Sequence, residues 1–358
     1  MRVLICPQHW GLGHLTRSIP VIRYFINSGH EVLLASSGAG VDFLRSEFPE
    51  IEVFELPDYK INYPSSNMYL NMLTQLGKMH LSIWKEHIKI RELVRLLKIE
   101  LLISDTRFGA FHGKIPSVMI AHHLHIPLSI KSFSWFSDTW LKLFYNKFDR
   151  LWVPDRAGSD NISGILAHNF KSAKKIFLGN ISRFQKLELS KRYDICFVLS
   201  GPEPQRTILE EKILDYRPKL SHLKCLLIRG KKEIHHIISD ESFQIVDILY
   251  SPELNEAMCA SDMIVSRSGY TTLLDLSIIC KKAFLIPTPG QFEQEYLAQD
   301  LKDRGIYYTI DQKNIDFDRD LEAANDGYTG FLPRNQKNES LDEILDREIE
   351  FLFPQSKS

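Results

Sequence analysis

The stretch RVLICPQHWGLGHLTRSIPVIRYFINSGHEVLLAS, residues 2–36, decides the fold. An apolar run at Val3–Cys6 leads into a glycine-rich loop, and apolar residues then recur at helical spacing from Leu15 to Ser28. A second apolar run, Glu31–Ser36, follows at once. Strand, helix and strand at this spacing predict a βαβ unit with parallel strands and a right-handed crossover.

Short apolar runs of the same kind recur along both halves of the chain, with helical patterns between them, the longest at about 66–97. This alternation predicts an α/β protein built from two doubly wound, Rossmann-like domains, and we expect the domains to face each other across a cleft. The other candidate strands are Val53–Leu56, Leu101–Ser104, Ser117–Ala121, Leu151–Val153, Ile176–Leu178, Ile195–Leu199, Cys225–Ile228, Ile245–Leu249, Met263–Val265 and Ala283–Ile286.

The length of 358 residues also favours two domains, at roughly 150 residues each. We expect an N-terminal domain at 1–178 and a C-terminal domain at 193–340. The segment 179–192 is polar and lacks strong periodicity, so we place the interdomain linker there. Residues 341–358 should form one closing helix, at Leu341–Leu352, and a tail.

The composition is typical of a globular protein, with 44% hydrophobic and 25% charged residues. The five cysteines are far apart and form no C-x-x-C pair, which argues against a disulfide framework or a zinc site and for a reducing compartment. The N-terminal apolar run is too short for a signal peptide, and no run reaches eighteen apolar residues. We therefore expect a cytoplasmic protein.

Charge is distributed unevenly between the halves. Residues 1–180 carry 21 basic and 15 acidic residues, whereas the remainder carries 23 and 30. A basic N-terminal half favours an anionic partner, either a phosphorylated acceptor or the inner face of the cell membrane, although chance segregation of solvated charges is an equal alternative. The aromatic stretch 133–145 fits membrane contact or, better, an amphipathic helix packed on the domain. No dense basic tract indicates nucleic-acid binding.

The loop after the first strand contains Gly11, Gly13 and His14. Two glycines allow a tight turn and close approach to a ligand, and free N–H groups at a helix start favour an anion, so we interpret the turn as an acceptor or phosphate loop. A histidine there is a candidate general base, the alternative being a helix cap. Asp105 ends a later strand, where it can orient a histidine or simply cap the next element.

The segment Val265–Asp275 follows a strand in the second half. Small residues and hydroxyls at the start of a helix form a phosphate cradle, and Arg267 can add positive charge. Asp275 lies one turn into that helix, where a carboxylate suits a sugar diol. The alternative makes Ser268 and Thr271 caps and Asp275 a partner of the helix dipole.

Three other loops have side chains suited to a nucleotide sugar. Pro287–Glu295 is a rigid loop whose amide and carboxylate groups suit sugar hydroxyls. Gly201–Arg206 follows a strand, and its arginine can reach a phosphate. Gly179–Arg183 lies at the expected interdomain crossing.

Taken in this order, the loops resemble the MurG-like branch of the GT-B glycosyltransferases, which makes a lipid-linked cell-wall disaccharide. The family's glycine-rich turn with its histidine matches Gly11–His14. Its G-N-P-V-R motif is similar to Gly179–Arg183, and its R-S-G-A-x-T-x-x-E signature matches Arg267–Asp275. The resemblance covers most of the chain but is concentrated in these motifs.

The resemblance implies that the domain at 1–178 is acceptor-binding and that the domain at 193–340 is nucleotide-sugar-binding. It also implies roles for single residues. By this resemblance, Asp275 corresponds to the acidic residue that holds the ribose. Gln294 corresponds to a glutamine that contacts the donor sugar, and Arg183 corresponds to an arginine that contacts the diphosphate. In related sugar transferases a histidine after the first strand pairs with an aspartate, which makes His14 and Asp105 the candidate catalytic pair. The candidate donor-binding residues are Arg183, Gly201, Arg206, Tyr250, Ser251, Arg267, Ser268, Gly269, Thr271, Thr272, Asp275, Glu293 and Gln294.

The activity implied is inverting, metal-independent transfer of a sugar from a nucleoside diphosphate, with UDP favoured, to a hydroxyl of a glycan or lipid-linked acceptor. The nucleotide sugar is a co-substrate, and no metal is expected: Asp316–Asp318 has D-x-D spacing but is interpreted as surface. Asp275 replaces a glutamate, and Ser200–Pro204 lacks the family's Gly-Gly-Ser, which suggests a sister family with another acceptor. A nucleotide-sugar hydrolase or epimerase and a non-catalytic binding protein stay open as alternatives.

Overall fold

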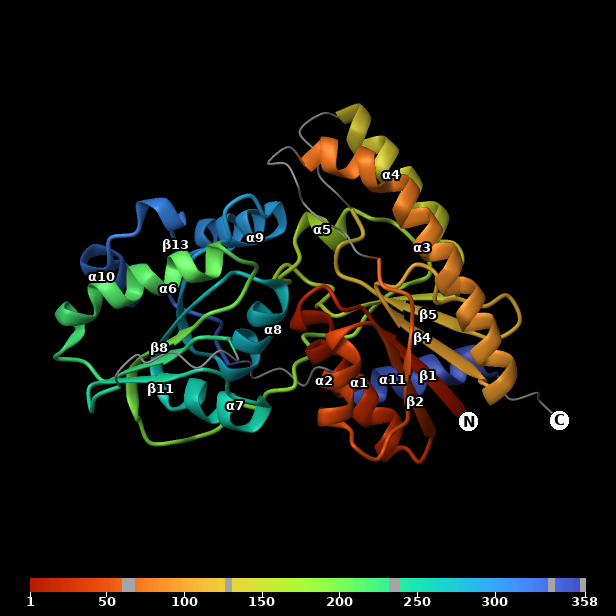
Figure 1. The fold of residues 1–358 in the computed structure, drawn as a ribbon, viewed down its shortest axis with the longest axis horizontal. Coiled ribbons are helices and arrows are strands. Elements are labelled where there is room, and N and C mark those ends of the chain that lie inside the picture. The colour runs from red at the N-terminus through yellow and green to blue at the C-terminus, as the bar shows by residue number, and fades with distance from the viewer. Residues whose placement is uncertain (60–67, 126–130, 232–238, 334–338, 355–358) are drawn as a thin grey trace. The chain divides into compact units, whose positions relative to one another are not determined.

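The structure, a computed structural model, describes residues 1–59, 68–125, 131–231, 239–333 and 339–354, without the side chains of 68–76 and 131–137. The chain divides into two compact units (Figure 1). The first unit comprises Met1–Ile181 and Lys337–Ser358, and the second Ser182–Gln336. The division therefore falls inside the stretch 179–192, and the C-terminal segment belongs to the first unit.

The first unit is built on a seven-stranded parallel sheet of order β3-β2-β1-β4-β5-β6-β7. Its strands are β1 (Arg2–Pro7), β2 (Glu31–Ser36), β3 (Val53–Glu55), β4 (Leu101–Asp105), β5 (Ser117–Ile120), β6 (Arg150–Val153) and β7 (Lys175–Phe177). Its helices are α1 (Leu12–Asn27), α2 (Ala39–Glu47), α3 (Met68–Leu97), α4 (Lys131–Tyr145), α5 (Ile165–His168) and α11 (Leu341–Leu352).

The second unit is built on a six-stranded parallel sheet of order β10-β9-β8-β11-β12-β13. Its strands are β8 (Tyr193–Val198), β9 (Cys225–Ile228), β10 (Phe243–Val246), β11 (Ser261–Ser266), β12 (Lys282–Leu285) and β13 (Tyr308–Thr309). Its helices are α6 (Gln205–Tyr216), α7 (Ser251–Cys259), α8 (Tyr270–Ile279), α9 (Phe292–Asp303) and α10 (Phe317–Asp326), with short 3₁₀ turns at Arg217–Leu220 and Gln312–Asn314. The two parallel α/β sheets predicted from the sequence are thus confirmed.

The strand order creates one topological switch point in each sheet. In the first unit it lies between β1 and β4, and in the second between β8 and β11, because the chain winds outward in opposite directions from these pairs. Loops that leave the carboxyl ends of such strands diverge and open a crevice, which is where doubly wound sheets bind ligands. The loops containing Gly11, Gly201 and Ser268 all leave these strands.

The sheets are anchored by strands that are buried on both faces. Val3, Leu4 and Ile5 of β1 are fully buried, as are Ile264 and Val265 of β11, because helices cover both sides of each sheet. Near-continuous apolar runs are the pattern that such strands require. The strand ends that follow are therefore held rigidly, which suits them to position functional side chains.

Helix α11 packs on the first unit. It begins with a capping box of Ser340 and Glu343. Tyr24 donates from its hydroxyl to Asp346 at 2.5 Å, and Trp152 donates from Nε1 to Glu348 at 2.9 Å. The C-terminal helix is thus part of the first unit's fold.

Helix α4 contains the aromatic stretch 133–145. The side chains of Phe133, Trp135 and Phe136 lie outside the described residues, but Leu141 and Tyr145 are buried in a hydrophobic cluster of the first unit. This packing agrees with the interpretation of the stretch as an amphipathic helix. Across the described residues, no helix combines the length and hydropathy needed to cross a membrane.

Candidate active site

In the first unit, the loop after β1 and the end of β4 bring His14 and Asp105 together. His14 stands in the first turn of α1, and its Nδ1 is 2.9 Å from Oδ1 of Asp105. The Asp105 side chain is fully buried, whereas 16% of the His14 side chain is exposed. The aspartate can therefore orient the ring while its outer edge stays accessible, which is the arrangement of a general base and its partner.

Asp105 is held by further side chains that the sequence analysis did not single out. Arg17 grips both carboxylate oxygens, from Nε at 2.7 Å and from Nη2. Ser18 donates to Oδ2 at 3.0 Å and Thr106 to Oδ1 at 3.1 Å. Burial alone would raise the pKa of Asp105, but the charges of Arg17 and His14 and their hydrogen bonds hold it well below its usual range. The carboxylate is thus ionised at any working pH.

Thr106 adopts a positive φ of 59°, a strained conformation for a β-branched residue. Its backbone N–H donates to the carbonyl of Ile120 at 3.1 Å, which ties the end of β4 to β5. Strained residues cluster at functional sites, where the surrounding structure enforces them. The sequence analysis missed Arg17, although it could have been found. Its i, i+3 spacing from His14 places both side chains on one face of α1.

The glycine-rich turn itself has an open backbone. Gly11 is the N-cap of α1 with a φ of 76°, and no side chain caps the helix. A Cβ at Gly11 would meet nothing within 4 Å, so the conformation and not crowding requires glycine. Gly13 follows in the first turn, where its carbonyl accepts from Thr16 at 3.2 Å. The role of this turn as an anion or acceptor loop stays a prediction.

In the second unit, Asp275 of α8 and Ser182 are in direct contact. The Ser182 hydroxyl donates to Oδ1 of Asp275 at 2.5 Å, and no described residue is hydrogen-bonded to the other carboxylate oxygen. Asp275 is 7% exposed, and burial raises its pKa to about 6, although Arg183 and Ser182 act in the opposite direction. A carboxylate with one free oxygen in such a site can bind a diol.

Arg183 lies beside this carboxylate and reaches α7. Its Nη1 donates to the Ser251 hydroxyl at 2.9 Å, and its charge lowers the pKa of Asp275. Tyr250, the N-cap of α7, is 59% exposed. Arg183, Ser251 and Asp275, which the sequence predicted in three separate motifs, are therefore gathered at one place in the second unit.

The start of α8 is an uncapped helix N-terminus. Gly269 is the N-cap, and no side chain caps the helix. The buried Ser268 donates from its hydroxyl to the carbonyl of Gln294 at 2.8 Å, so its interpretation as a cap is wrong. Thr271 and Thr272 are half-buried in the first turn. The positive end of the α8 helix dipole at this point favours a phosphate.

The loop Pro287–Glu295 is closed by its own polar side chains. Gln294 accepts from the Thr288 N–H at 2.9 Å and donates to Gln291 at 2.5 Å, and Glu295 accepts from the Gly290 N–H at 2.8 Å. Glu293 is half-buried in the first turn of α9. Gln294 therefore shapes the loop, and a role on a sugar requires that it exchange these bonds.

Two predicted phosphate-binding arginines have other partners in the structure. Arg206 is 3% exposed and forms ion pairs with Glu203 and Glu210, while its Nη1 also donates to the carbonyl of Arg229. Arg267 is 1% exposed and donates to backbone carbonyls and to Gln312 at 2.6 Å. Both guanidinium groups are buried in the fold and fix the loops around them, so a direct phosphate contact by either arginine stays a prediction and requires that these bonds be exchanged.

Gly201 lies close to Thr288 and to the buried Arg267. Its φ is 102°, and a Cβ there would stand 3.3 Å from Thr288 Oγ1 and 4.0 Å from Arg267 Nε. Both atoms are buried and have no hydrogen-bond partner among the residues that the structure describes. The loop after β8 therefore needs glycine both for its backbone conformation and for its close approach to the loop after β12.

The segment Asp316–Asp318, which has D-x-D spacing, is partly buried in the core of the second unit. Phe317 is 4% exposed and packs in the hydrophobic cluster of the second unit, while Asp318 binds Tyr216 and Lys219. Over the ranges that the structure describes, no group of three or more His, Cys, Asp or Glu side chains is arranged to hold a metal ion.

The architecture of two Rossmann-like sheets matches solved glycosyltransferases of the GT-B fold. The spinosyn forosaminyltransferase SpnP superposes with a TM-score of 0.66 at 15% identity, covering 98% of this chain and 99% of that one. The MurG of Acinetobacter baumannii superposes with a TM-score of 0.55 at 12% identity, covering 92% and 96%. At these identities the structures establish the fold, and the chain has the GT-B fold.

Sequence comparisons agree with the MurG-like resemblance. Residues 195–340 match the glycosyltransferase family 28 C-terminal domain. The UDP-N-acetylglucosamine–N-acetylmuramyl-(pentapeptide) pyrophosphoryl-undecaprenol N-acetylglucosamine transferase of Caldanaerobacter subterraneus is 29% identical over 41% of this chain and 46% of its own length. An uncharacterized glycosyltransferase of Methanopyrus kandleri is 22% identical over 86% and 91%.

The chain spans about half the length of the curated relatives it matches first. The match to the family 28 C-terminal domain nevertheless lies in the second half of the chain, and the resemblance to MurG-like glycosyltransferases predicted from the sequence is confirmed.

Proposed function

We propose that the protein transfers a sugar from a nucleoside-diphosphate donor, held by the second unit, to an acceptor hydroxyl that His14 deprotonates. The observation that carries this proposal is the cluster of Asp275, Ser251 and Arg183 near the start of α8. Asp275 and Ser251 lie within the residues that match the family 28 domain, and Arg183 precedes them in the chain. The cluster offers a carboxylate for the ribose diol, a cation for the diphosphate and a helix N-terminus that favours negative charge. His14 with Asp105 adds a base in the first unit.

The proposed reaction inverts the anomeric centre. Nε2 of His14 takes the proton of the acceptor hydroxyl, and the oxygen attacks the anomeric carbon from the side opposite the diphosphate. The bond to the diphosphate breaks, and its electron pair leaves with the nucleotide. Arg183 and the α8 N-terminus stabilise the charge that develops there, in the place of a metal ion; one such donor is typically worth on the order of 10²–10³ in rate.

We propose UDP as the nucleotide and a glycan or lipid-linked hydroxyl as the acceptor. The names of the MurG relatives, which specify a UDP donor and an undecaprenol-linked acceptor, support this choice. Some solved neighbours contain thymidine diphosphate instead, so the base needs direct measurement.

The test is a thermal-shift panel of nucleotide sugars on the wild type and on Asp275→Ala, followed by turnover assays. A transferase should be stabilised by one class of donor, lose that shift in the variant, and consume the donor rapidly only with an acceptor. Fast consumption without an acceptor would indicate a hydrolase or epimerase. Binding with no turnover under any condition would indicate a binding protein. Stabilisation by no nucleotide sugar would contradict the proposal.

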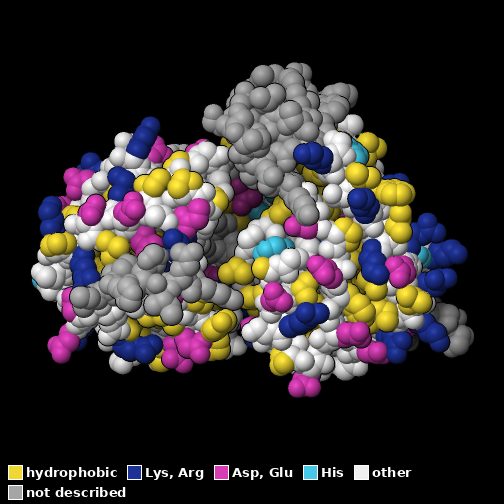
Figure 2. Space-filling model, in the orientation of Figure 1, with side chains coloured by type: hydrophobic (Ala, Val, Ile, Leu, Met, Phe, Trp, Pro, Cys, Tyr) yellow, Lys and Arg dark blue, Asp and Glu magenta, His cyan; other side chains and the backbone are white. Residues whose placement is uncertain are grey.

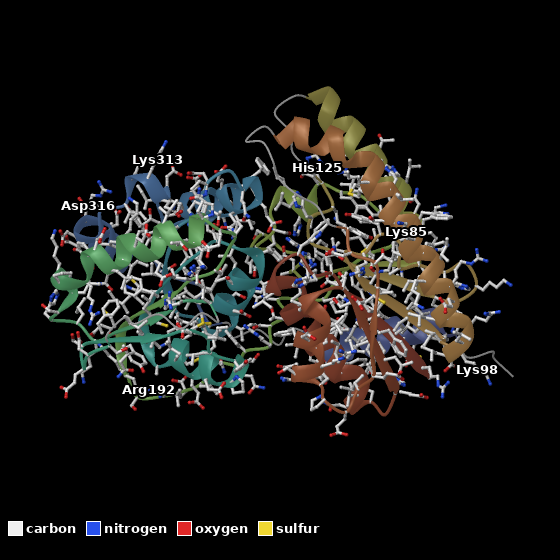
Figure 3. The ribbon with its side chains drawn as sticks, viewed as in Figure 1. Lys85, Lys98, His125, Arg192, Lys313 and Asp316 are labelled. Atoms are coloured by element: carbon white, nitrogen blue, oxygen red, sulfur yellow. The ribbon has the colours of Figure 1, made fainter. Side chains whose placement is uncertain are left out.

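The outer face of α3 supports peripheral contact of the first unit with an anionic membrane surface. Leu81, Trp84 and Ile88 recur at i, i+3 and i+7 and are 52%, 59% and 46% exposed, opposite the buried face of the helix. Lys85, Arg95 and Glu92 are exposed on the same face, and Figure 2 shows hydrophobic side chains among cationic and some acidic ones over this region. Figure 3 labels Lys85 on α3. Aromatic and aliphatic side chains among cations are typical of interfacial helices.

Vesicle sedimentation tests this contact. The wild type should bind vesicles that contain phosphatidylglycerol and release them at high salt, because the screening length falls from about 10 Å at 0.1 M to about 3 Å at 1 M salt. Trp84→Ala should weaken binding severalfold, whereas Leu332→Ala, which removes a side chain 68% exposed in the second unit, should not. Equal binding of Trp84→Ala and wild type would rule out this face.

A further inference from the structure

Arg17 contacts the proposed base, His14, and three side chains around it. It is 1% exposed, and its guanidinium donates to both oxygens of Asp105 and, at 3.1 Å, to Thr106. Its Nη1 is 2.6 Å from Nδ1 of His122, and its Nη2 is 2.8 Å from Nδ1 of His14. An arginine has only donors, so each contact constrains the group it meets.

The contact with His122 determines that Nδ1 of this ring is an acceptor and does not carry the hydrogen. Because Nη1 of Arg17 can only donate, Nδ1 of His122 must accept at 2.6 Å. His122 is 5% exposed and follows β5, the neighbour of β4 in the sheet. The guanidinium is therefore braced on one side by β5 and on the other by the carboxylate at the end of β4.

The hydrogen bonds of Arg17 also determine which ring nitrogen of His14 carries the proton. Nη2 of Arg17 has two hydrogens, and the Asp105 carboxylate and the Thr106 hydroxyl are both within reach. A carboxylate is the stronger acceptor for a charged donor, so those hydrogens point away from His14. Nδ1 of His14 then donates to Asp105 at 2.9 Å, and the lone pair falls on Nε2.

We infer that Arg17 is a positioning residue for His14: it clamps Asp105 and Thr106 so that the ring keeps its proton on Nδ1 and presents Nε2 as the base. The inference rests on the proposed function for its role in transfer. The tautomer it assigns can be measured without any transfer reaction. Lysine at position 17 would keep the charge but lose the two-point grip on the carboxylate.

The test combines nitrogen NMR with kinetics on the full chain. In protein labelled with ¹⁵N-histidine, the His14 signals are identified by their loss in His14→Gln. The wild type should show a protonated Nδ1 and an unprotonated Nε2, whereas Arg17→Met should show a mixture of tautomers. Its kcat should fall about 10- to 100-fold with the donor KM within about twofold, and Arg17→Lys should recover part of the loss.

Arg107 provides the matched control. It is equally buried in the same unit and pairs with Glu86, but its guanidinium contacts neither His14 nor Asp105. Arg107→Lys should lose thermal stability as Arg17→Lys does, yet keep the His14 spectrum of the wild type. Thermal unfolding shows which variants fold. If Arg17→Met does not fold, the tautomer of His14 is measured in Arg17→Lys.

A folded Arg17 variant with the wild-type tautomer and kcat would overturn the inference, as would the same spectral change in Arg107→Lys. If the spectra change as expected but the wild type transfers no sugar, the proposed function fails and the structural role of Arg17 stands.

Discussion

Replacing Asp275 by asparagine should stabilise the ligand-free protein at neutral pH while weakening nucleotide binding. Burial raises the pKa of this carboxyl from 3.8 to about 6, so the folded protein holds an ionised group in a place that favours the neutral form. Asparagine has almost the same shape and can still accept the Ser182 hydrogen bond through its carbonyl oxygen. The substitution therefore removes a charge without removing the packing.

The size of the effect follows from linkage between protonation and folding. A pKa difference of one pH unit corresponds to about 1.4 kcal/mol, so ionised Asp275 costs about 3 kcal/mol. Because the folded-state pKa is raised, this cost is absent below about pH 4, grows as the pH rises, and is complete above about pH 6. Asparagine should recover most of it at pH 7.5 and little at pH 4.5.

The assay is urea unfolding of both proteins between pH 4.5 and 8. All five tryptophans lie no further along the chain than Trp152, so their fluorescence follows only the first unit. Far-UV circular dichroism follows both units, and the variant should change only the transition that fluorescence does not report. A variant less stable than wild type at pH 8, or a difference that does not vary with pH, would refute the reasoning.

Three further predictions follow from the same contacts. His14→Gln should lower turnover by about 10²- to 10⁴-fold and leave nucleotide affinity within about twofold, as measured by calorimetry; an equal loss in affinity would argue against a base. Arg206→Met should destabilise the second unit by about 3 kcal/mol, because it breaks the buried ion pair with Glu210, without changing nucleotide affinity of the folded protein. Nucleotide-sugar affinity of the wild type should fall about tenfold from pH 7 to pH 5, as Asp275 becomes protonated, and should stay constant in Asp275→Asn.

Strands and helices with strong patterns were predictable from the sequence. The bounds of β2, β9 and α11 agree with the predicted Glu31–Ser36, Cys225–Ile228 and Leu341–Leu352, because apolar runs or a capping box mark them. β10 begins at Phe243, two residues before the predicted start, because the Asp240 side chain accepts from the N–H of Phe243 and forms the preceding turn. β13 was missed, since a two-residue edge strand has no pattern to detect.

The candidate site was predictable where strand order decides proximity. His14 and Asp105 follow two strands that lie side by side at a switch point, so their pairing follows from topology. Arg17 and Thr106 were missed because their roles depend on side-chain geometry. Arg206 was assigned to a phosphate because a sequence shows a cation near a loop but not the carboxylates that occupy its donors.

The central claim is that Asp275 binds the ribose of a nucleotide, and a double-mutant cycle tests it most directly. Calorimetry would compare UDP with its 2′,3′-dideoxy analogue on the wild type and on Asp275→Asn. We predict that either change alone weakens binding by about 1.5–3 kcal/mol and that the two together weaken it hardly further, because both remove the same hydrogen bonds. Fully additive losses, or tight binding of UDP by Asp275→Asn, would contradict the claim.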